Sequence, residues 1–408
     1  MMHLPTRRRL RALGVTALAA VLAFTVTACN EPSTDAFYAP PSSVTGASGN
    51  IIRSRTSVYA GDPIFKMPVA GVKASQVLYN STDGQGHAIA VSGTVLVPTS
   101  PYIGLGGRPL VTFAPGTRGL GQDCAPSFSL TQGTDYEASS ITAALQKGYA
   151  VAVTDCQGMG TPGPHSYMVG TTMGHSVLDM ARAAQRLPGS GLSVSTPVGI
   201  WGYSEGGSAA LWAAEQAATY APELNLKGVA AGGVPGDLLQ VASMLDGSAF
   251  LSLELMTAVG YDKAYPELNL NSYLNQSGKD LLTTAKKACL VSVDGFGQIA
   301  GTAYKHVGDF TTSDPLANAT WKARLNANKL GSGQPTVPVF QYHAVSDNMV
   351  QFAQAKALRD TYCAKGVNET WLELPNAEHA LAMVQGQGPA LDFLSARFTS
   401  WFPPTDNC

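Results

Sequence analysis

The sequence predicts an α/β fold, in which a mainly parallel sheet is covered by helices on both faces. Short apolar runs recur along the chain, at 109–114, 149–154, 198–203 and 227–234. They are apolar throughout rather than alternating, which is typical of strands buried on both faces. Segments with helical spacing separate them, as in Val177, Met180, Ala181, Ala184 and Leu187. Repeated β-α-β units of this kind place functional side chains beyond the carboxyl ends of the strands.

Further elements complete the predicted sheet and its cover. The runs 75–79 and 88–97 flank the turn sequence Thr82-Asp83-Gly84-Gln85-Gly86 and predict a hairpin. Late in the chain, strands are predicted at 337–343 and 370–374, separated by a helix at 351–362. Two more predicted helices are 141–147, closed by Gly148, and the alanine-rich 208–219.

The first 28 residues have the pattern of an export signal. Arg7, Arg8, Arg9 and Arg11 precede an apolar run over 13–28, which is short for a membrane span and fits the core of a signal peptide. The run ends in Val26-Thr27-Ala28-Cys29, which resembles the lipobox of bacterial lipoproteins, where the cysteine is lipidated. We therefore expect an exported protein that is held at a membrane surface through Cys29. Cleavage after Ala28 with release from the cell is the alternative.

The rest of the chain is predicted to form a tether and one large domain. Residues 29–54 are rich in Pro, Ser, Thr and Gly without a period, which predicts a flexible tether. Residues 55–408 are predicted to form the α/β domain. Within them, 238–309 changes to helical segments without clear strands, which predicts a helical cap inserted over the active end of the sheet. The bulky apolar residues of the cap either face an acyl chain or pack against one another.

Charge and composition exclude several classes of protein. The chain has 26 basic and 28 acidic residues, and the four signal arginines are among the basic ones. The exported part therefore carries 22 basic residues and a net charge of −6, which argues against a nucleic-acid binder. The sequence lacks the close Cys-x-x-Cys pairing of a zinc site. We expect no metal, no cofactor and a monomer.

One segment has the pattern of a catalytic nucleophile. Gly202-Tyr203-Ser204-Glu205-Gly206 matches G-x-S-x-G, with the predicted strand 198–203 before it and the predicted helix 208–219 after it. In this context a strained turn lifts the serine hydroxyl above the sheet, and the glycines let strand and helix approach closely. An ordinary glycine-rich turn is the alternative in a chain with 43 glycines, and the strand–helix context favours the nucleophile.

The two partners that a serine nucleophile needs follow in the required order. In the α/β-hydrolase fold the order along the chain is Ser, acid, His, and the last two follow late strands. Asp347 follows the predicted strand 337–343, and His379 follows the predicted strand 370–374. His379 would take the proton of Ser204, while Asp347 would orient the imidazole and stabilise its protonated form. The sequence therefore predicts an α/β-hydrolase fold with this triad.

The competing residues are less suitable. His343 lies at the end of a predicted strand, where a structural histidine is the commoner case, and His306 falls in or beside the cap and precedes the acid. Asp360 lies in a predicted helix, where we expect it to face solvent. His379 is the histidine that combines the correct order with a predicted loop position.

An oxyanion formed beside Ser204 needs two aligned donors. One predicted donor is the backbone N–H of Glu205, the residue after the nucleophile. The other is predicted in the loop after the strand 109–114, from the backbone N–H of Gly116 or Thr117. The Glu205 side chain is expected to point away from the oxyanion into a polar network.

The cysteines leave their own pairing open. The chain has six, and lipidation of Cys29 leaves five, which permits two disulfides and one thiol in an oxidising compartment.

Several motifs resemble the secretory lipase family of α/β-hydrolases, over about 57 to the C-terminus. They are Pro115-Gly116-Thr117-Arg118-Gly119, Cys124-Ala125-Pro126-Ser127, Asp155 with Gly158 and Gly160-Thr161-Pro162-Gly163, and Gly202-Tyr203-Ser204-Glu205-Gly206-Gly207. The resemblance implies a capped hydrolase of carboxylic esters, including acylglycerols, with Ser204, Asp347 and His379 at the triad positions. It also implies disulfides from Cys124 to Cys289 and from Cys363 to Cys408. The chain departs from the family at Cys156-Gln157, where Tyr-Glu is more usual.

The expected function is therefore hydrolysis of carboxylic esters, as a lipase or carboxylesterase, through an acyl-enzyme on Ser204. Acyl transfer to an alcohol would use the same residues. A catalytically silent binding lipoprotein on the same fold is the alternative from another class. A serine peptidase is disfavoured, because no charged feature that would recognise a peptide N-terminus is evident.

Overall fold

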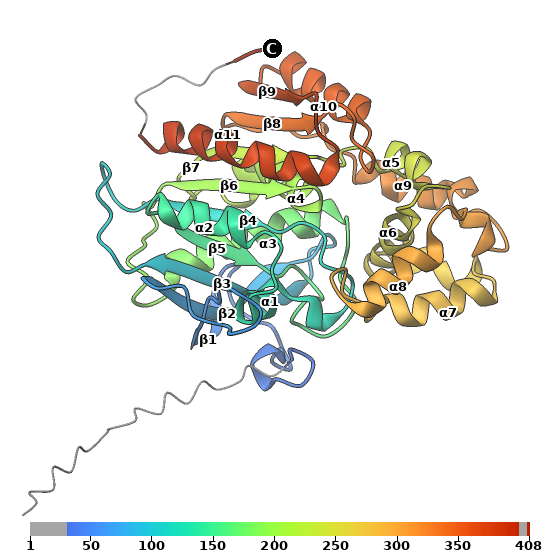
Figure 1. Ribbon diagram of the computed structural model, residues 1–408, viewed down its shortest axis with the longest axis horizontal. Helices are drawn as coiled ribbons and strands as arrows, with labels where there is room; N and C mark the ends of the chain where they lie inside the picture. Colours follow the sequence, from blue (N-terminus) through green and yellow to red (C-terminus); the bar gives the residue numbers. More distant parts are fainter. Residues whose placement is uncertain (1–30, 400–405) are drawn as a thin grey trace, which may run out of the picture.

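The computed structural model describes residues 31–399 and 406–408 (Figure 1). The predicted signal peptide 1–28 and Cys29 lie outside the described residues. In the described part no helix has both the length and the hydropathy needed to cross a bilayer.

A nine-stranded sheet within residues 31–399 forms the centre of the molecule, in the order β1-β2-β3-β5-β4-β6-β7-β8-β9. The strands are β1 (Ile51–Ser57), β2 (Val72–Thr82), β3 (Ala88–Pro98), β4 (Leu110–Ala114), β5 (Ala150–Thr154), β6 (Val198–Tyr203), β7 (Leu226–Gly232), β8 (Val339–Ala344) and β9 (Glu369–Leu374). The first three strands and the β3–β5 pair are antiparallel, and all pairs from β5 to β9 are parallel. The predicted hairpin is β2–β3.

Helices cover both faces of this sheet (Figure 1). Helices α3 (Gly170–Arg186), α4 (Glu205–Tyr220) and α10 (Phe352–Ala364) share one hydrophobic core with one face. Helices α1 (Pro126–Gln132), α2 (Ala138–Gln146) and α11 (His379–Thr399) share a second core with the other face. Alternation along a strand divides its side chains between the two, so that Ile200 of β6 joins the first core and Trp201 joins the second. The predicted α/β-hydrolase fold is confirmed.

The prediction of a flexible tether over 29–54 is wrong for its described part. A short 3₁₀ helix, η1 (Ala36–Tyr38), buries Phe37 and Tyr38 against β2 and β3. From Ile51 the chain is already strand β1, which pairs with β2. The composition of this segment is that of a linker, but two buried aromatic rings and one set of ladder hydrogen bonds are enough to fix it.

The cap is longer than its predicted bounds of 238–309. Between the end of β7 and the start of β8 the chain forms α5 (Leu238–Leu245), α6 (Leu251–Ala264), α7 (Gln276–Ala285), α8 (Val293–Thr302) and α9 (Ala319–Ala327). The last helix belongs to the cap because Trp321 and Leu325 of α9 line the same cavity as α5 and α6. The cap lies to one side of the sheet in Figure 1.

Both disulfides that the family resemblance implied are present. Cys124 is bonded to Cys289, which ties the loop after β4 to the cap. Cys363 is bonded to Cys408, which ties the end of α10 to the C-terminus. Cys156 is the remaining cysteine of the described part, and its thiol is free and buried.

Candidate active site

Ser204 stands on a strained turn between β6 and α4. Its φ of +57° and ψ of −122° lie where a side chain other than glycine is seldom found. The turn is possible because its neighbours are glycines: a Cβ on Gly206 would lie 2.0 Å from the Ala114 carbonyl oxygen. A Cβ on Gly202 would lie 2.2 Å from the carbonyl oxygen of Gly206. Strand, turn and helix are therefore packed as closely as a nucleophile elbow requires.

The structure brings the three predicted triad residues together. His379 Nε2 lies 2.9 Å from Ser204 Oγ. His379 Nδ1 lies 2.7 Å from Asp347 Oδ2. Because the carboxylate accepts, Nδ1 carries the proton, and Nε2 is left to accept the serine proton. His379 is the first residue of α11 rather than a loop residue as predicted, and the strand-to-helix corner still places it at the carboxyl edge of the sheet.

The loop after β8 holds the carboxylate of Asp347 in place. Its Oδ1 accepts the backbone N–H groups of Met349 and Val350, at 2.9 and 2.7 Å. Burial acts to raise the pKa of Asp347, but the hydrogen bond and charge of His379 hold that pKa below its ordinary value. Asp347 is therefore ionised at neutral pH and available to stabilise an imidazolium.

The three competing residues lie outside the chain of hydrogen bonds from Asp347 through His379 to Ser204. His343 is buried, its Nε2 donates to the Val350 carbonyl oxygen at 2.9 Å, and burial lowers its pKa, so it is neutral. His306 is exposed and pairs with Asp246 in the cap. Asp360 is 51% exposed and pairs with Lys356 and Arg359.

The oxyanion loop differs from the prediction in one respect. Glu205 begins α4, where its backbone N–H has no intrahelical acceptor, and no other described residue accepts it. The Gly116 N–H, in contrast, donates to Glu137 Oε2 at 2.8 Å and is therefore not available to an oxyanion. The Thr117 N–H has no acceptor among the described residues, while its hydroxyl is paired with that of Tyr167 at 2.9 Å. Of the two predicted loop donors, the structure leaves Thr117.

A buried ion cluster that the sequence analysis missed supports this loop. Arg118 contacts Asp135 and Glu137, each at 2.8 Å, and its guanidinium lies over the ring of Tyr136. Tyr136 also donates to the Thr117 carbonyl oxygen at 2.9 Å. Burial raises the pKa of Glu137 to about 7 despite the nearby guanidinium. Through the bonds of Glu137 to the Gly116 N–H and of Tyr136 to the Thr117 carbonyl oxygen, the cluster fixes the backbone of the loop.

The Glu205 side chain points into a buried polar pair, as predicted. Its Oε1 lies 2.6 Å from His165 Nε2. His165 Nδ1 lies 2.8 Å from the Gln157 carbonyl oxygen, which can only accept, so Nδ1 carries a proton. A second proton must then lie between Nε2 and the carboxylate. The pair is therefore neutral as a unit, and no uncompensated negative charge stands beside the nucleophile.

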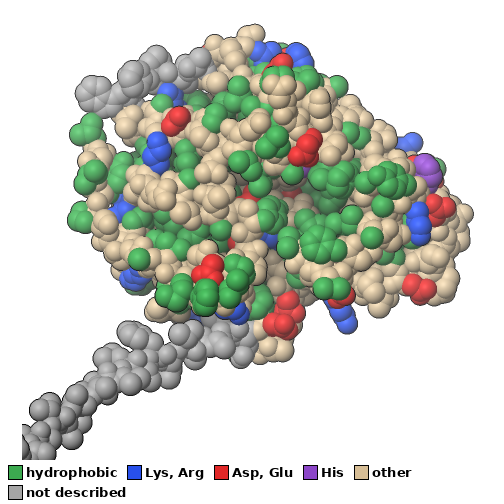
Figure 2. Space-filling model, viewed as in Figure 1, with side chains coloured by type: hydrophobic (Ala, Val, Ile, Leu, Met, Phe, Trp, Pro, Cys, Tyr) green, Lys and Arg blue, Asp and Glu red, His purple; other side chains and the backbone are tan. Residues whose placement is uncertain are grey.

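An apolar cavity lies within the cap. Its volume is about 90 Å³. It is lined mainly by leucine and other apolar side chains from α5, α6, α7 and α9. Leu238, Val241 and Leu245 of α5 are buried and also line it, so these residues both pack and face the cavity. Val241 and Leu245 pack against Val350, three residues after the triad acid. Figure 2 shows hydrophobic side chains around a hollow between the cap and the sheet domain.

The described residues offer no obvious place for a metal ion. No group of three or more His, Cys, Asp or Glu among them is arranged to hold one. The acidic Asp155, which follows β5, is instead used by protein donors: it accepts from the backbone and hydroxyl of Ser127 and from the hydroxyl of Ser92. Burial raises the pKa of Asp155 to about 6.

Comparison with known proteins identifies the family. Residues 125–406 match the model of a family described as secretory lipase. The chain belongs to this family. The family that the motifs predicted is thereby confirmed, and the relatives of this chain include both named lipases and a protein named as inactive.

Three relatives illustrate this range. A probable inactive lipase of Mycobacterium tuberculosis is 32% identical over 393 residues, covering 92% of this chain and 84% of the relative. A secreted triacylglycerol lipase of Malassezia furfur is 27% identical over 362 residues, covering 85% of this chain and 75% of the relative. The solved structure of Candida antarctica lipase A in its closed state matches with a TM-score of 0.81 and 27% identity, covering 93% of this chain and 89% of that structure.

Proposed function

We propose that this member of the secretory lipase family hydrolyses carboxylic esters, as a lipase or carboxylesterase, through an acyl-enzyme on Ser204. The observation that carries the proposal is the unbroken chain of hydrogen bonds from Asp347 through His379 to Ser204. A serine hydroxyl alone is a weak nucleophile, and this arrangement provides the base that activates it.

The steps follow from the protonation states of the triad. Ser204 Oγ attacks the ester carbonyl as its proton passes to His379 Nε2, and Asp347 stabilises the resulting imidazolium. His379 then protonates the departing alcohol. Water, deprotonated by the same nitrogen, attacks the acyl-enzyme and releases the acid. The backbone N–H groups of Glu205 and Thr117 stabilise the oxyanion, each contributing about 3 kcal/mol to the transition state.

The cap cavity is the proposed site of the acyl chain. Its lining is mainly apolar, with leucine the commonest residue, and it is connected by packing to the loop that carries Asp347. An acyl chain placed there replaces its contacts with water by contacts with leucine side chains, which gains about 0.8 kcal/mol per buried methylene. The substrates are therefore esters or acylglycerols with an aliphatic acyl group.

The proposed location is outside the cytoplasm, at a membrane surface. The export signal over 1–28 and the lipobox-like sequence before Cys29 support a lipid anchor on that cysteine. Release after cleavage at Ala28 is the alternative. We propose that the protein acts as a monomer.

Two alternatives use the same fold. Acyl transfer to an alcohol differs from hydrolysis only in the acceptor that reaches the acyl-enzyme. A silent binding lipoprotein is suggested by the relative named as a probable inactive lipase. The assembled triad of this chain favours catalysis over that alternative.

The test is hydrolysis of p-nitrophenyl esters from acetate to palmitate and of emulsified triglyceride, by the wild type and by Ser204→Ala. We expect turnover by the wild type and background rates for the variant. Activity confined to short dissolved esters would support a carboxylesterase rather than a lipase. Equal rates for the two proteins would reject the proposal.

A further inference from the structure

Helix α8 of the cap exposes an apolar face that no described residue covers. Val293 is 88% exposed and Phe296 is 60% exposed, and Val291, just before the helix, is 55% exposed. A Cβ added to Gly297 or Gly301 would meet no atom within 4 Å, so the space over this face is open. Valine and phenylalanine at such exposure on one helix face are unfavourable in water.

Exposed lysines lie on both sides of this helix in the sequence. Lys286 and Lys287 precede it, and Lys305 follows it, all three exposed. Asp294 is the exposed acidic residue of the helix. The concentration of lysines contrasts with the net charge of −6 expected for the exported chain as a whole. An apolar helix face bordered by lysines matches a lipid surface that carries anionic headgroups.

The apolar face lies close to the point where the described chain begins. Ser33 donates its backbone N–H and its hydroxyl to the carboxylate of Asp123, at 2.7 and 2.8 Å. The next residue, Cys124, is bonded to Cys289, with 5.1 Å between the Cα atoms. Val291 follows two residues later, so its Cα lies within about 17 Å of that of Asp123.

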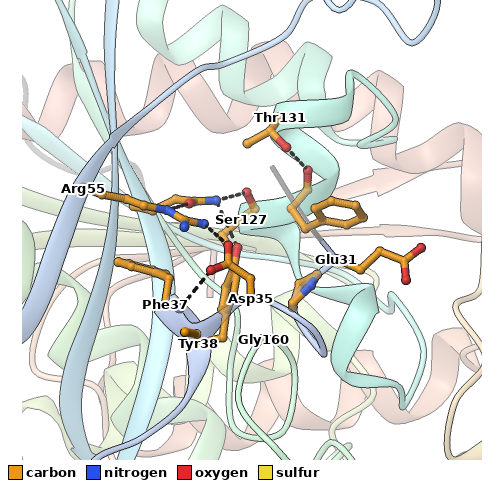
Figure 3. Close-up of polar contacts among 12 residues, drawn as sticks. Glu31, Asp35, Phe37, Tyr38, Arg55, Ser127, Thr131 and Gly160 are labelled. Atoms are coloured by element: carbon orange, nitrogen blue, oxygen red, sulfur yellow. Dashed lines mark hydrogen bonds and ion pairs between the residues drawn. The ribbon is translucent and has the colours of Figure 1, made fainter. Parts of the chain in front are cut away.

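The first described residues are fixed rather than loosely attached. The buried Pro32 accepts a hydrogen bond from Gln122 at 3.2 Å. In Figure 3, Tyr38 reaches Ser127, and Arg55 pairs with Asp35. The Arg55 guanidinium also lies 4.2 Å from the centre of the Phe37 ring. Because consecutive Cα atoms lie about 3.8 Å apart, a lipid on Cys29 would be attached within about 40 Å of Val291, which allows the lipid and α8 to reach one lipid surface.

We infer that the exposed face of α8, with its bordering lysines, docks on the anionic lipid surface that the Cys29 anchor reaches. The inference rests on the proposed lipidation for its geometry. The anchor supplies attachment, and the α8 face sets orientation by inserting Val293 and Phe296 among the acyl chains while the lysines contact headgroups. The cap, and with it the apolar cavity, is thereby held at the lipid surface rather than facing away from it.

The experiment isolates the α8 face from the anchor. The Cys29→Ala protein is compared with the same protein carrying Val293→Ser and Phe296→Ser, in sedimentation with vesicles of phosphatidylglycerol and phosphatidylcholine. A matched control carries Ile103→Ser and Val194→Ser, which are 99% and 70% exposed and precede β4 and β6, at the opposite edge of the sheet. We expect binding to fall about tenfold for the α8 variant and to stay unchanged for the control. Added salt weakens the binding of the parent protein.

Two outcomes would overturn the inference. One is equal binding by the α8 variant and the control, with unchanged thermal unfolding of both. The other is a change of the α8 variant in oligomeric state without a change in vesicle binding, which would mean that a second copy covers this face. Labelling of the wild type, but not of Cys29→Ala, by a palmitate analogue tests the anchor separately. An unlabelled wild type removes the anchor and leaves the vesicle result to stand on its own.

Discussion

Glu254 gives the sharpest prediction about the cap cavity. It comes from α6 and is the one acidic residue among the described residues that line the cavity. Its Oε2 is buried without a hydrogen-bond partner. Burial raises the pKa of Glu254 to about 8, and the negative charges of Asp246 and Asp314 add to the effect. At neutral pH the carboxyl is therefore protonated, and the cavity carries no charge.

Ionisation of Glu254 should close the cavity to an aliphatic chain. With a pKa of about 8, roughly 90% of the carboxyl groups are neutral at pH 7 and roughly 10% at pH 9. The ratio of kcat/KM for p-nitrophenyl octanoate to that for the acetate should then fall about tenfold between these pH values. The triad residues do not line the cavity, so we expect the two-carbon acyl group of the acetate to stay outside it, and the ratio then cancels the titration of the triad. In Glu254→Gln the ratio should not change with pH.

Unfolding provides an independent measurement of the same group. The folded protein keeps the Glu254 proton up to pH about 8, whereas the unfolded chain loses it near the ordinary value of 4.5. The folded state therefore loses stability as the pH rises from about 4.5 to about 8. Glu254→Gln removes this loss and should be more stable than the wild type at pH 7, by up to about 3 kcal/mol in urea unfolding. The role of Glu254 would be refuted if the octanoate-to-acetate ratio of kcat/KM still fell tenfold from pH 7 to pH 9 in Glu254→Gln. It would also be refuted if that ratio did not change with pH in the wild type.

Other predictions concern the site and the elbow. Asp347→Asn should lower kcat for p-nitrophenyl butyrate roughly 10⁴-fold, whereas Asp360→Asn, on the exposed helix, should leave it unchanged; equal effects would contradict the assignment of the acid. Glu205→Ala should lower the free energy of unfolding by about 2–4 kcal/mol in urea, and Glu205→Gln by less than about 1 kcal/mol, since the amide can still form a hydrogen bond with His165 Nε2. Gly206→Ala should lower the free energy of unfolding by about 3 kcal/mol or more, because the added Cβ would lie 2.0 Å from a backbone oxygen. Gly297→Ala, where the added Cβ meets no atom within 4 Å, should not lower it measurably. A stable, active Gly206→Ala protein would contradict the packing of the elbow.

The strands were predictable because burial on both faces makes the sequence itself apolar. The runs ending at Ala114, Thr154 and Tyr203 appear in the structure as β4, β5 and β6, with bounds that differ from the prediction by one residue at most. The triad positions were predictable for a related reason. Ser204, Asp347 and His379 each follow a recognisable strand, and parallel strands end at the same edge of a sheet.

The supporting contacts were not predictable, because they depend on residues that meet only in the folded chain. Nothing around His165 indicates that it contacts Glu205, 40 residues away. Arg118 was visible in a motif, but its partners Asp135 and Glu137 look like solvated acids until the fold buries them. Composition predicts a tether over 29–54, because it gives little weight to single aromatic residues such as Tyr38, which is buried in the fold.

The central claim is that Ser204 is a nucleophile activated by His379. Its most direct test is the intact mass of the protein, followed by peptide mapping, after treatment with a fluorophosphonate at neutral pH. We expect one adduct per chain, located on Ser204, formed by the wild type and absent from Ser204→Ala, with His379→Ala reacting far more slowly. An unlabelled wild type, or an adduct that persists in Ser204→Ala, would contradict it.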